Sequence, residues 1–391
     1  MKVSKHVKLF SVGFAMVLTS ACGAKSDSKD DNSSTDAADG AGGSGSTSNK
    51  VGSATNIADL KLAGALAINL PEAFGGTASG TSLRLLAGKK SQEACMMGDT
   101  IKQSVSSLSE VAGFFCHMEV EKDRMKFGTK YKIIAGGNEF ARIFVDNSQA
   151  ASGKLTIGFC QADTGEGSHR QLITLDTITD TGPKGTIISD GSGTYQGSSM
   201  TYARSTTFDM SVAGIVSLIS KDKNTQGTSS TFVREVSLDL KQSGQSSLKL
   251  AHKGNQTFNN SPVEFFDRGI AYLSGDKGSA LFQHKGDHGG TTYTFTNRAH
   301  FSKTGDVLTS ADVGADLQPA TTAIPAYLPS DFSPDAPSGW VGSGCPDFAE
   351  EITIDPQAGG HAACNQDHSN NGMDCWDSNK YEQSSEQAVV Q

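Results

Sequence analysis

The sequence has no excess of positive charge and, beyond its first residues, no long hydrophobic run. Its 391 residues carry a formal net charge of −9, and residues 56–330 hold 26 acidic and 26 basic side chains. Because nucleic-acid binding requires a basic face, this composition predicts no nucleic-acid partner. After residue 23, no run approaches the roughly 18 apolar residues of a membrane-spanning helix.

The motifs of common enzyme classes are missing as well. The chain has no G-x-S-x-G elbow, no P-loop, no H-E-x-x-H pair and no dinucleotide-binding fingerprint. Residues 246–249 match S-x-x-K, but that pattern works on a helix and these residues fall on a predicted strand. Since catalytic triads assemble from distant residues, a secreted hydrolase or inhibitor stays open as an alternative to a non-enzymatic protein.

The first 23 residues have the layout of a bacterial export signal. Three lysines precede an apolar run from 9 to 18, which is too short to span a bilayer. Small residues then lead to Cys22, and this end resembles the lipobox of bacterial lipoproteins, although leucine, the commonest residue three positions before the cysteine, is absent there. The resemblance implies cleavage after Ala21, acyl chains on Cys22 and attachment to the outer membrane, because Gly23 replaces the Asp used for inner-membrane retention. An ordinary secretory peptide is the alternative.

Charge and composition divide the rest of the chain. Residues 24–55 are rich in Ser, Asp, Gly and Ala, which predicts a disordered tether with a reach of about 30 Å. From Asp331 onward there are eleven acidic residues and one lysine. We therefore expect four parts: a signal peptide at 1–21, the lipidated cysteine and tether at 22–55, a β-rich domain at 56–330, and an acidic, cysteine-containing segment at 331–391.

Once Cys22 is assigned to the lipid, an even number of cysteines remains. Six cysteines in an exported chain predict three disulfides, and a zinc site is the alternative although no C-x-x-C pair exists. The candidates are Cys95, Cys116, Cys160, Cys345, Cys364 and Cys375. Cys95 and Cys116 lie at opposite ends of a predicted helix, too far apart to pair, and Cys116 with Cys160 is the preferred pairing.

Short runs of alternating apolar and polar residues dominate the sequence from residue 127 to 302. Leu155, Ile157 and Phe159 illustrate the pattern, and Gly-rich polar stretches separate the runs. The spacing predicts a mainly β (α+β) fold: an antiparallel meander forming a sheet, sandwich or incomplete barrel. The apolar run 212–219 fits either a buried strand or a short helix.

One helix is predicted at about 100–118. Apolar residues recur there at the spacing of one helical face, and Thr100 with Gln103 form a plausible capping box. We expect this helix to pack on the sheet. Proline-rich residues 318–337 then predict an extended strap across the domain, held by apolar side chains such as Tyr327 and Phe332.

The sharpest metal-like pattern lies in the C-terminal segment. Residues 367–373 match the first half of an EF-hand calcium loop, with the candidate ligands Asp367, Ser369, Asn371 and the backbone of Met373. Ser378 replaces the bidentate Glu at position 12, so a metal-free loop closed by a disulfide is the preferred interpretation and calcium the alternative.

Two pairs of histidines are weaker candidates. His284 and His288 are expected in a solvated hairpin turn, and His361 with His368 in the acidic tail could bind zinc adventitiously. No other cofactor is predicted.

Taken together, these features predict a lipid-anchored envelope protein of the outer membrane with a structural or interaction role, including surface adhesion. Its partners would be the membrane, through the anchor, and an unidentified protein or lipid ligand. A carrier of lipid or another apolar ligand in a cavity between sheet and helix is the first alternative.

Overall fold

The computed structural model describes most of the chain from residue 50 to residue 383. Described are residues 50–54, 56–62, 66, 89–135, 137–161, 167–195, 198–227, 230–258, 261–288, 291–337, 347–355, 358–362, 364, 375, 378 and 380–383. Residues 22–49 of the expected tether, Cys345 and the calcium-loop candidates lie outside these residues. The end of the expected tether is ordered, because Lys50–Ser53 forms a single helical turn and Val51 is buried in the core.

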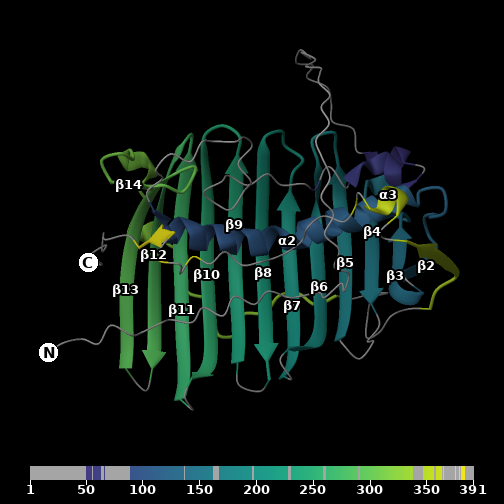
Figure 1. Ribbon diagram of the computed structural model, residues 1–391. Coiled ribbons are helices and arrows are strands. Elements are labelled where there is room, and N and C mark those ends of the chain that lie inside the picture. The colour runs from purple at the N-terminus through teal and green to yellow at the C-terminus, as the bar shows by residue number, and fades with distance from the viewer. Residues whose placement is uncertain are drawn as a thin grey trace.

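A single sheet of fourteen strands forms the body of the molecule (Figure 1). Its order is β14-β13-β12-β11-β10-β9-β8-β7-β6-β5-β4-β3-β2-β15, so neighbours in sequence are neighbours in space. The strands are β2 Lys130–Ala135, β3 Asn138–Asp146, β4 Leu155–Gln161, β5 Gly167–Ile178, β6 Pro183–Tyr195, β7 Ser198–Asp209, β8 Ile215–Gln226, β9 Ser230–Lys241, β10 Gln245–Phe258, β11 Ser261–Ser274, β12 Lys277–His288, β13 Thr291–Ser302, β14 Val307–Leu308 and β15 Glu350–Ile354.

The predicted mainly β fold and antiparallel meander are confirmed. In this sheet, every strand from β2 to β14 pairs antiparallel with the next, and β15 pairs parallel with β2. Among the described strands, the two ends of the order do not pair with each other, so the sheet is open. The apolar run left undecided at 212–219 leads into β8.

The predicted helix is present but longer than expected. It is α2, Gln92–Val120, and the Ser91 hydroxyl caps it by accepting from the Ala94 N–H. Thr100 is not the cap: its hydroxyl lies inside the helix and donates to the Met96 carbonyl at 2.9 Å. Seen in Figure 1, α2 crosses the strands on one face, which we call the helix face.

The space between α2 and the sheet is filled by apolar side chains. The row of sheet residues beneath the helix is Leu175, Phe208, Leu218, Leu238, Leu248, Ala271, Ala280 and Ala299, which are in lateral register. Helix residues Ile101, Leu108 and Phe115 meet this core and are themselves fully buried. Burial of this apolar layer stabilises the fold.

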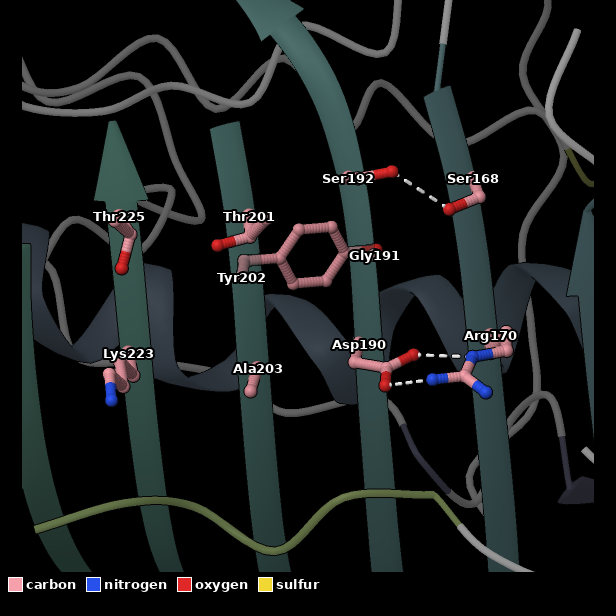
Figure 2. Close-up of a pocket in the computed structure, with 10 residues that line it drawn as sticks. All are labelled: Ser168, Arg170, Asp190, Gly191, Ser192, Thr201, Tyr202, Ala203, Lys223 and Thr225. Carbon is pink, nitrogen blue, oxygen red and sulfur yellow. Dashed lines mark hydrogen bonds and ion pairs between the residues drawn. The ribbon is translucent and has the colours of Figure 1, made fainter. Parts of the chain in front are cut away.

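The proline-rich strap crosses the opposite face, which we call the strap face (Figures 1 and 2). The Tyr327 hydroxyl donates to Oε1 of Gln283 at 2.8 Å, and the guanidinium of Arg268 lies 4.1 Å from the centre of the Tyr327 ring. Further along, Lys221 Nζ lies 5.9 Å from the centre of the Phe332 ring. After the helical turn Thr321–Ala323, residues 324–337 of the strap form no helix or strand, and the strap aromatic residues contact charged side chains as well as the Phe266 ring.

Two disulfides join the C-terminal segment to α2. Cys95 bonds to Cys375 and Cys116 bonds to Cys364, so the predicted pairing of Cys116 with Cys160 is wrong. Cys160 is also disulfide-bonded. The predicted pairing joined the end of a helix to the end of a strand, whereas the fold returns the distant C-terminal segment to the end of α2.

Short elements complete the structure. They are the single-turn helices Lys50–Ser53, Ile57–Leu60, Ala150–Ser152, Ala315–Leu317 and Thr321–Ala323, the helix α3 Gly359–Ala362, and the two-stranded pair of β1 Lys90–Ser91 with β16 Tyr381–Glu382. Among the described helices, none combines the length and apolarity needed to cross a membrane.

Candidate functional site

A polar depression lies on the strap face over β5 to β8 (Figure 2). Its volume is about 340 Å³. The residues that line it are Ser168, Arg170, Asp190, Gly191, Ser192, Thr201, Tyr202, Ala203, Lys223 and Thr225. We call this set the polar depression.

The register explains why a hollow forms there. Arg170, Asp190, Ala203 and Lys223 are lateral neighbours on four successive strands. Because Ala203 is the smallest of the four, a gap opens between the long side chains on either side of it. The Tyr202 ring does not fill this gap, since its hydroxyl is hydrogen-bonded to Nδ1 of His169 on the opposite face.

The depression combines an ion pair, a second cation and several hydroxyls. The Arg170 guanidinium binds both carboxylate oxygens of Asp190, with Nε 2.8 Å from Oδ1. The hydroxyls of Ser168 and Ser192 lie 3.0 Å apart. With Lys223 included, the depression carries one more positive than negative charge. Such a surface can donate hydrogen bonds to ligand oxygens and attract an anionic group.

A second polar cluster lies on the helix face, beside α2. A Cβ on Gly269 would lie 3.5 Å from Met97 of α2, which places that part of β11 under the helix. Asp267 lies two residues before Gly269, on the same face of β11. It belongs to a row of side chains in lateral register that we call the charged row. Its members are Arg204, Asp222, Arg234, His252, Asp267 and His284.

The charged row is paired along its length. Arg234 Nε lies 2.8 Å from Asp222 Oδ2, and both side chains are largely buried. Asp267 lies between two histidines, with Nδ1 of His284 at 2.5 Å and Nδ1 of His252 at 3.4 Å. Burial alone raises the pKa of Asp267, but the hydrogen bonds from both histidines outweigh it and hold the pKa below its usual value.

The pairing does not satisfy every polar atom of the row. Nε2 of His284 is buried and has no hydrogen-bond partner within the described residues. The ring is stacked on Phe295, with ring centres 4.9 Å apart. The predicted solvated turn at 284–288 is thus wrong, because these residues continue β12 and His284 is 2% exposed.

Beyond the charged row, aromatic rings and glycines alternate across the strands. Phe232, Gly254, Phe265, Gly286 and Tyr293 are lateral neighbours on β9 to β13. A Cβ on Gly286 would lie 2.4 Å from the Tyr293 ring, and one on Gly254 would lie 2.3 Å from the Phe265 ring. The rings therefore occupy the space that glycine leaves open, and these glycines belong to strands rather than turns.

Aromatic packing on the helix face also includes His169 of β5. Its ring packs edge-on against Phe159, which in turn packs against Phe114 of α2. Burial is the main reason, and the charge of Arg204 the second, that the pKa of His169 falls to about 4, although Asp190 opposes the shift.

The tail histidine His361 is found at the end of α2. Its Nδ1 lies 3.0 Å from Nδ1 of His117, and its Nε2 lies 2.8 Å from a carboxylate oxygen of Glu121. Burial and the charge of His361 lower the pKa of His117. The alternative pairing of His361 with His368 falls outside the described residues, as do the lipidation residue Cys22 and the calcium candidates.

Within the described part of the chain, no group of three or more His, Cys, Asp or Glu side chains is arranged to hold a metal ion. The depression and the charged row were not predicted from the sequence. Their lateral neighbours on adjacent strands are 9 to 24 residues apart in the sequence, and only the strand register brings them together. No family model, curated protein or solved structure matches this chain, so its function is argued from its own residues.

Proposed function

We propose that this protein is a lipid-anchored interaction protein of the bacterial outer membrane, and that its polar depression binds a polyhydroxylated, negatively charged ligand such as an acidic carbohydrate. The observation that carries the binding part is the depression itself, with its Arg170–Asp190 pair, its hydroxyls and Lys223. The anchor part rests on the lipobox-like end of the first 23 residues.

The chemistry of the depression suits sugar hydroxyls and a carboxylate. The Asp190 carboxylate accepts hydrogen bonds, the Arg170 guanidinium donates them, and neighbouring serine and threonine hydroxyls do both. Lys223 adds a positive charge and forms no ion pair among the described residues, so it is available for an acidic group. The sheet holds these groups on rigid strands, which keeps the loss of conformational entropy on binding small.

The filled layer beneath α2 weighs against the carrier of apolar ligands. Such a carrier needs an apolar cavity between sheet and helix, whereas Ile101, Leu108 and Phe115 meet the sheet with no exposed surface. A hydrolase gains no support either. In the described residues, no serine or threonine hydroxyl is hydrogen-bonded to His169, His252 or His284, so none of these three histidines is placed to activate one as a nucleophile.

Isothermal titration with two oligosaccharides tests the binding. We expect an acidic oligogalacturonate to bind and a neutral malto-oligosaccharide of equal length to bind more weakly. Removing one charge-assisted contact with Lys223→Ala should weaken the acidic ligand about tenfold or more. Lys249→Ala, on the exposed strap face away from the depression, is the matched control and should leave the affinity unchanged. Absence of binding, or equal affinity of Lys223→Ala and the parent, would refute the assignment.

The anchor is tested separately. Cys22→Ser should move the protein from the membrane fraction to the soluble fraction, and mass spectrometry of the parent should show acyl chains on residue 22. Protease treatment of intact cells then distinguishes surface display, in which the domain is digested, from a periplasmic domain, which is protected. A parent protein without acyl chains would overturn the anchor and leave the binding proposal standing.

A further inference from the structure

The two edges of the sheet differ in their protection against further strand pairing. At one edge, β15 has five residues and includes the exposed Glu350 and Glu351. At the other edge, β13 has twelve residues, and β14 pairs only with His300 and Phe301. Natural sheets commonly protect an edge by shortness, charge, proline or a bulge. The β15 edge has two of these features.

The β13 edge has none of them over its first seven residues. Residues 291–297 read Thr-Thr-Tyr-Thr-Phe-Thr-Asn, without charge, proline or a recorded register shift against β12. Within the described residues, no strand pairs with their outer side. Thr292, Thr294 and Phe295 are exposed. Threonine and aromatic residues have high strand propensity, so this segment is suited to further pairing.

The backbone groups that face outward can be identified from β14. The Ser302 N–H donates to the Asp306 carbonyl, so at residue 302 the backbone points away from β12. Because this direction alternates along a strand, Thr292, Thr294 and Thr296 also direct their N–H and C=O groups outward. Thr294 lies at the centre of the unprotected segment.

We propose that β13 pairs antiparallel with β13 of a second copy of this chain, centred on Thr294. In this register Tyr293 of one copy lies opposite Phe295 of the other, and the threonines lie opposite threonines. Aromatic pairs and threonine pairs are favourable cross-strand neighbours, and the uncharged edges do not repel each other. A two-fold axis closes the assembly, whereas pairing of β13 with the acidic β15 edge would propagate without end.

The register also avoids collision with β14. Residue 300, where β14 begins to pair, would face position 288 of the other copy, which precedes the start of β13. Paired in this way, the two strap faces are continuous, so both depressions lie on one side of the dimer.

A single strand pairing buries less than the roughly 1,000 Å² usual for a stable interface, so we expect a weak dimer. Covalent trapping of the paired chains is therefore the sensitive test.

The test uses cysteine pairs in the full chain carrying Cys22→Ser. Two residues that exchange both backbone hydrogen bonds have Cα atoms about 5.5 Å apart, which a disulfide can bridge. Thr294→Cys should therefore form a disulfide dimer under mild oxidation. Thr292→Cys alone should react at least about tenfold more slowly, because the register places it opposite Thr296. A mixture of Thr292→Cys and Thr296→Cys chains should form the heterodimer.

Backbone variants supply a second measurement. Thr294→Pro removes an outward N–H that β12 does not use, so the fold should persist while sedimentation at high protein concentration shows loss of the dimer. Thr294→Val keeps the N–H and should still associate. Equal cross-linking of Thr292→Cys and Thr294→Cys, or a strictly monomeric parent together with no cross-link at residue 294, would overturn the proposal. Cross-linking in cells to a different protein alone would also overturn it.

Discussion

The two faces of the sheet are stabilised by different means. On the helix face, α2 covers closely packed apolar rows and two disulfides fix both ends of the helix region to the C-terminal segment. On the strap face, an extended segment contacts the sheet through single rings and hydrogen bonds, and the depression beside it holds polar and charged groups. The difference indicates that the helix face carries most of the stability of the fold, and it is the strap face that would bind the ligand proposed above.

The largest expected effect is truncation of the helix core. Phe115→Ala removes a fully buried ring between α2 and the sheet, and we expect a loss of about 3–5 kcal/mol in the free energy of unfolding. Ile219→Ala on the strap face is the control, since Ile219 is 46% exposed and should cost less than about 0.5 kcal/mol. Urea denaturation measures both. Equal losses would remove the distinction between the faces.

Removal of a disulfide should come next. Replacing Cys116 and Cys364 together by serine should destabilise the protein by about 2–4 kcal/mol, because the bond closes a long loop in the unfolded chain. The same double change at Cys95 and Cys375 is the comparison. The two loops span 248 and 280 residues, so loop length alone predicts costs within about 0.1 kcal/mol of each other. A much larger difference, measured by denaturant unfolding, would mean that one bond also positions α2.

The meander could be predicted from sequence because alternation is a local property. Runs such as 155–159 show the pattern within five residues, and the Gly-rich connections between many of them are real turns, as at Gly275. Gly286 was interpreted as part of a turn because glycine usually marks one. In the structure it lies in β12 beneath the Tyr293 ring, a contact that depends on the neighbouring strand.

The charged row and the depression could not be predicted for the same reason. Asp267 and His284 become neighbours only when the β11–β12 register is known, and a shift of one residue would send them to opposite faces. The helix start was missed because Thr100 fits a cap as well as Ser91 does in sequence. The long-range disulfides were missed because their partners are more than 240 residues apart.

The pH dependence of stability compares two adjacent residues on opposite faces, His169 on the helix face and Arg170 on the strap face. The pKa of His169, on the helix face, falls to about 4 in the folded protein, against about 6.5 in an unfolded chain. The unfolded state therefore takes up a proton first as pH drops, and stability is lost between about pH 6.5 and pH 4. Since the ring is partly exposed, we expect a contribution of about 2 kcal/mol.

Denaturant unfolding at pH 7, 5.5 and 4.5 measures this loss. His169→Phe keeps an aromatic ring against Phe159 but cannot take up a proton, so the variant should lose less stability on acidification. Arg170→Lys, one residue away on the strap face, should keep the parent's pH dependence over the same interval. If His169→Phe loses as much stability as the parent, another histidine is responsible.

The smallest expected effect is on the strap. Tyr327→Phe removes the hydroxyl that donates to Gln283 while keeping the ring over Arg268, and we expect a cost of about 1 kcal/mol. Tyr272→Phe is the matched control, because the Tyr272 hydroxyl has no hydrogen-bond partner in the described residues, and its cost should be within about 0.5 kcal/mol of zero. If both variants unfold like the parent, the Tyr327 hydroxyl adds nothing to the free energy of unfolding, and Tyr327 stabilises the strap only through its ring contacts, including those with Arg268 and Phe266. Tyr327→Ala would then show the larger loss, since it removes those contacts as well.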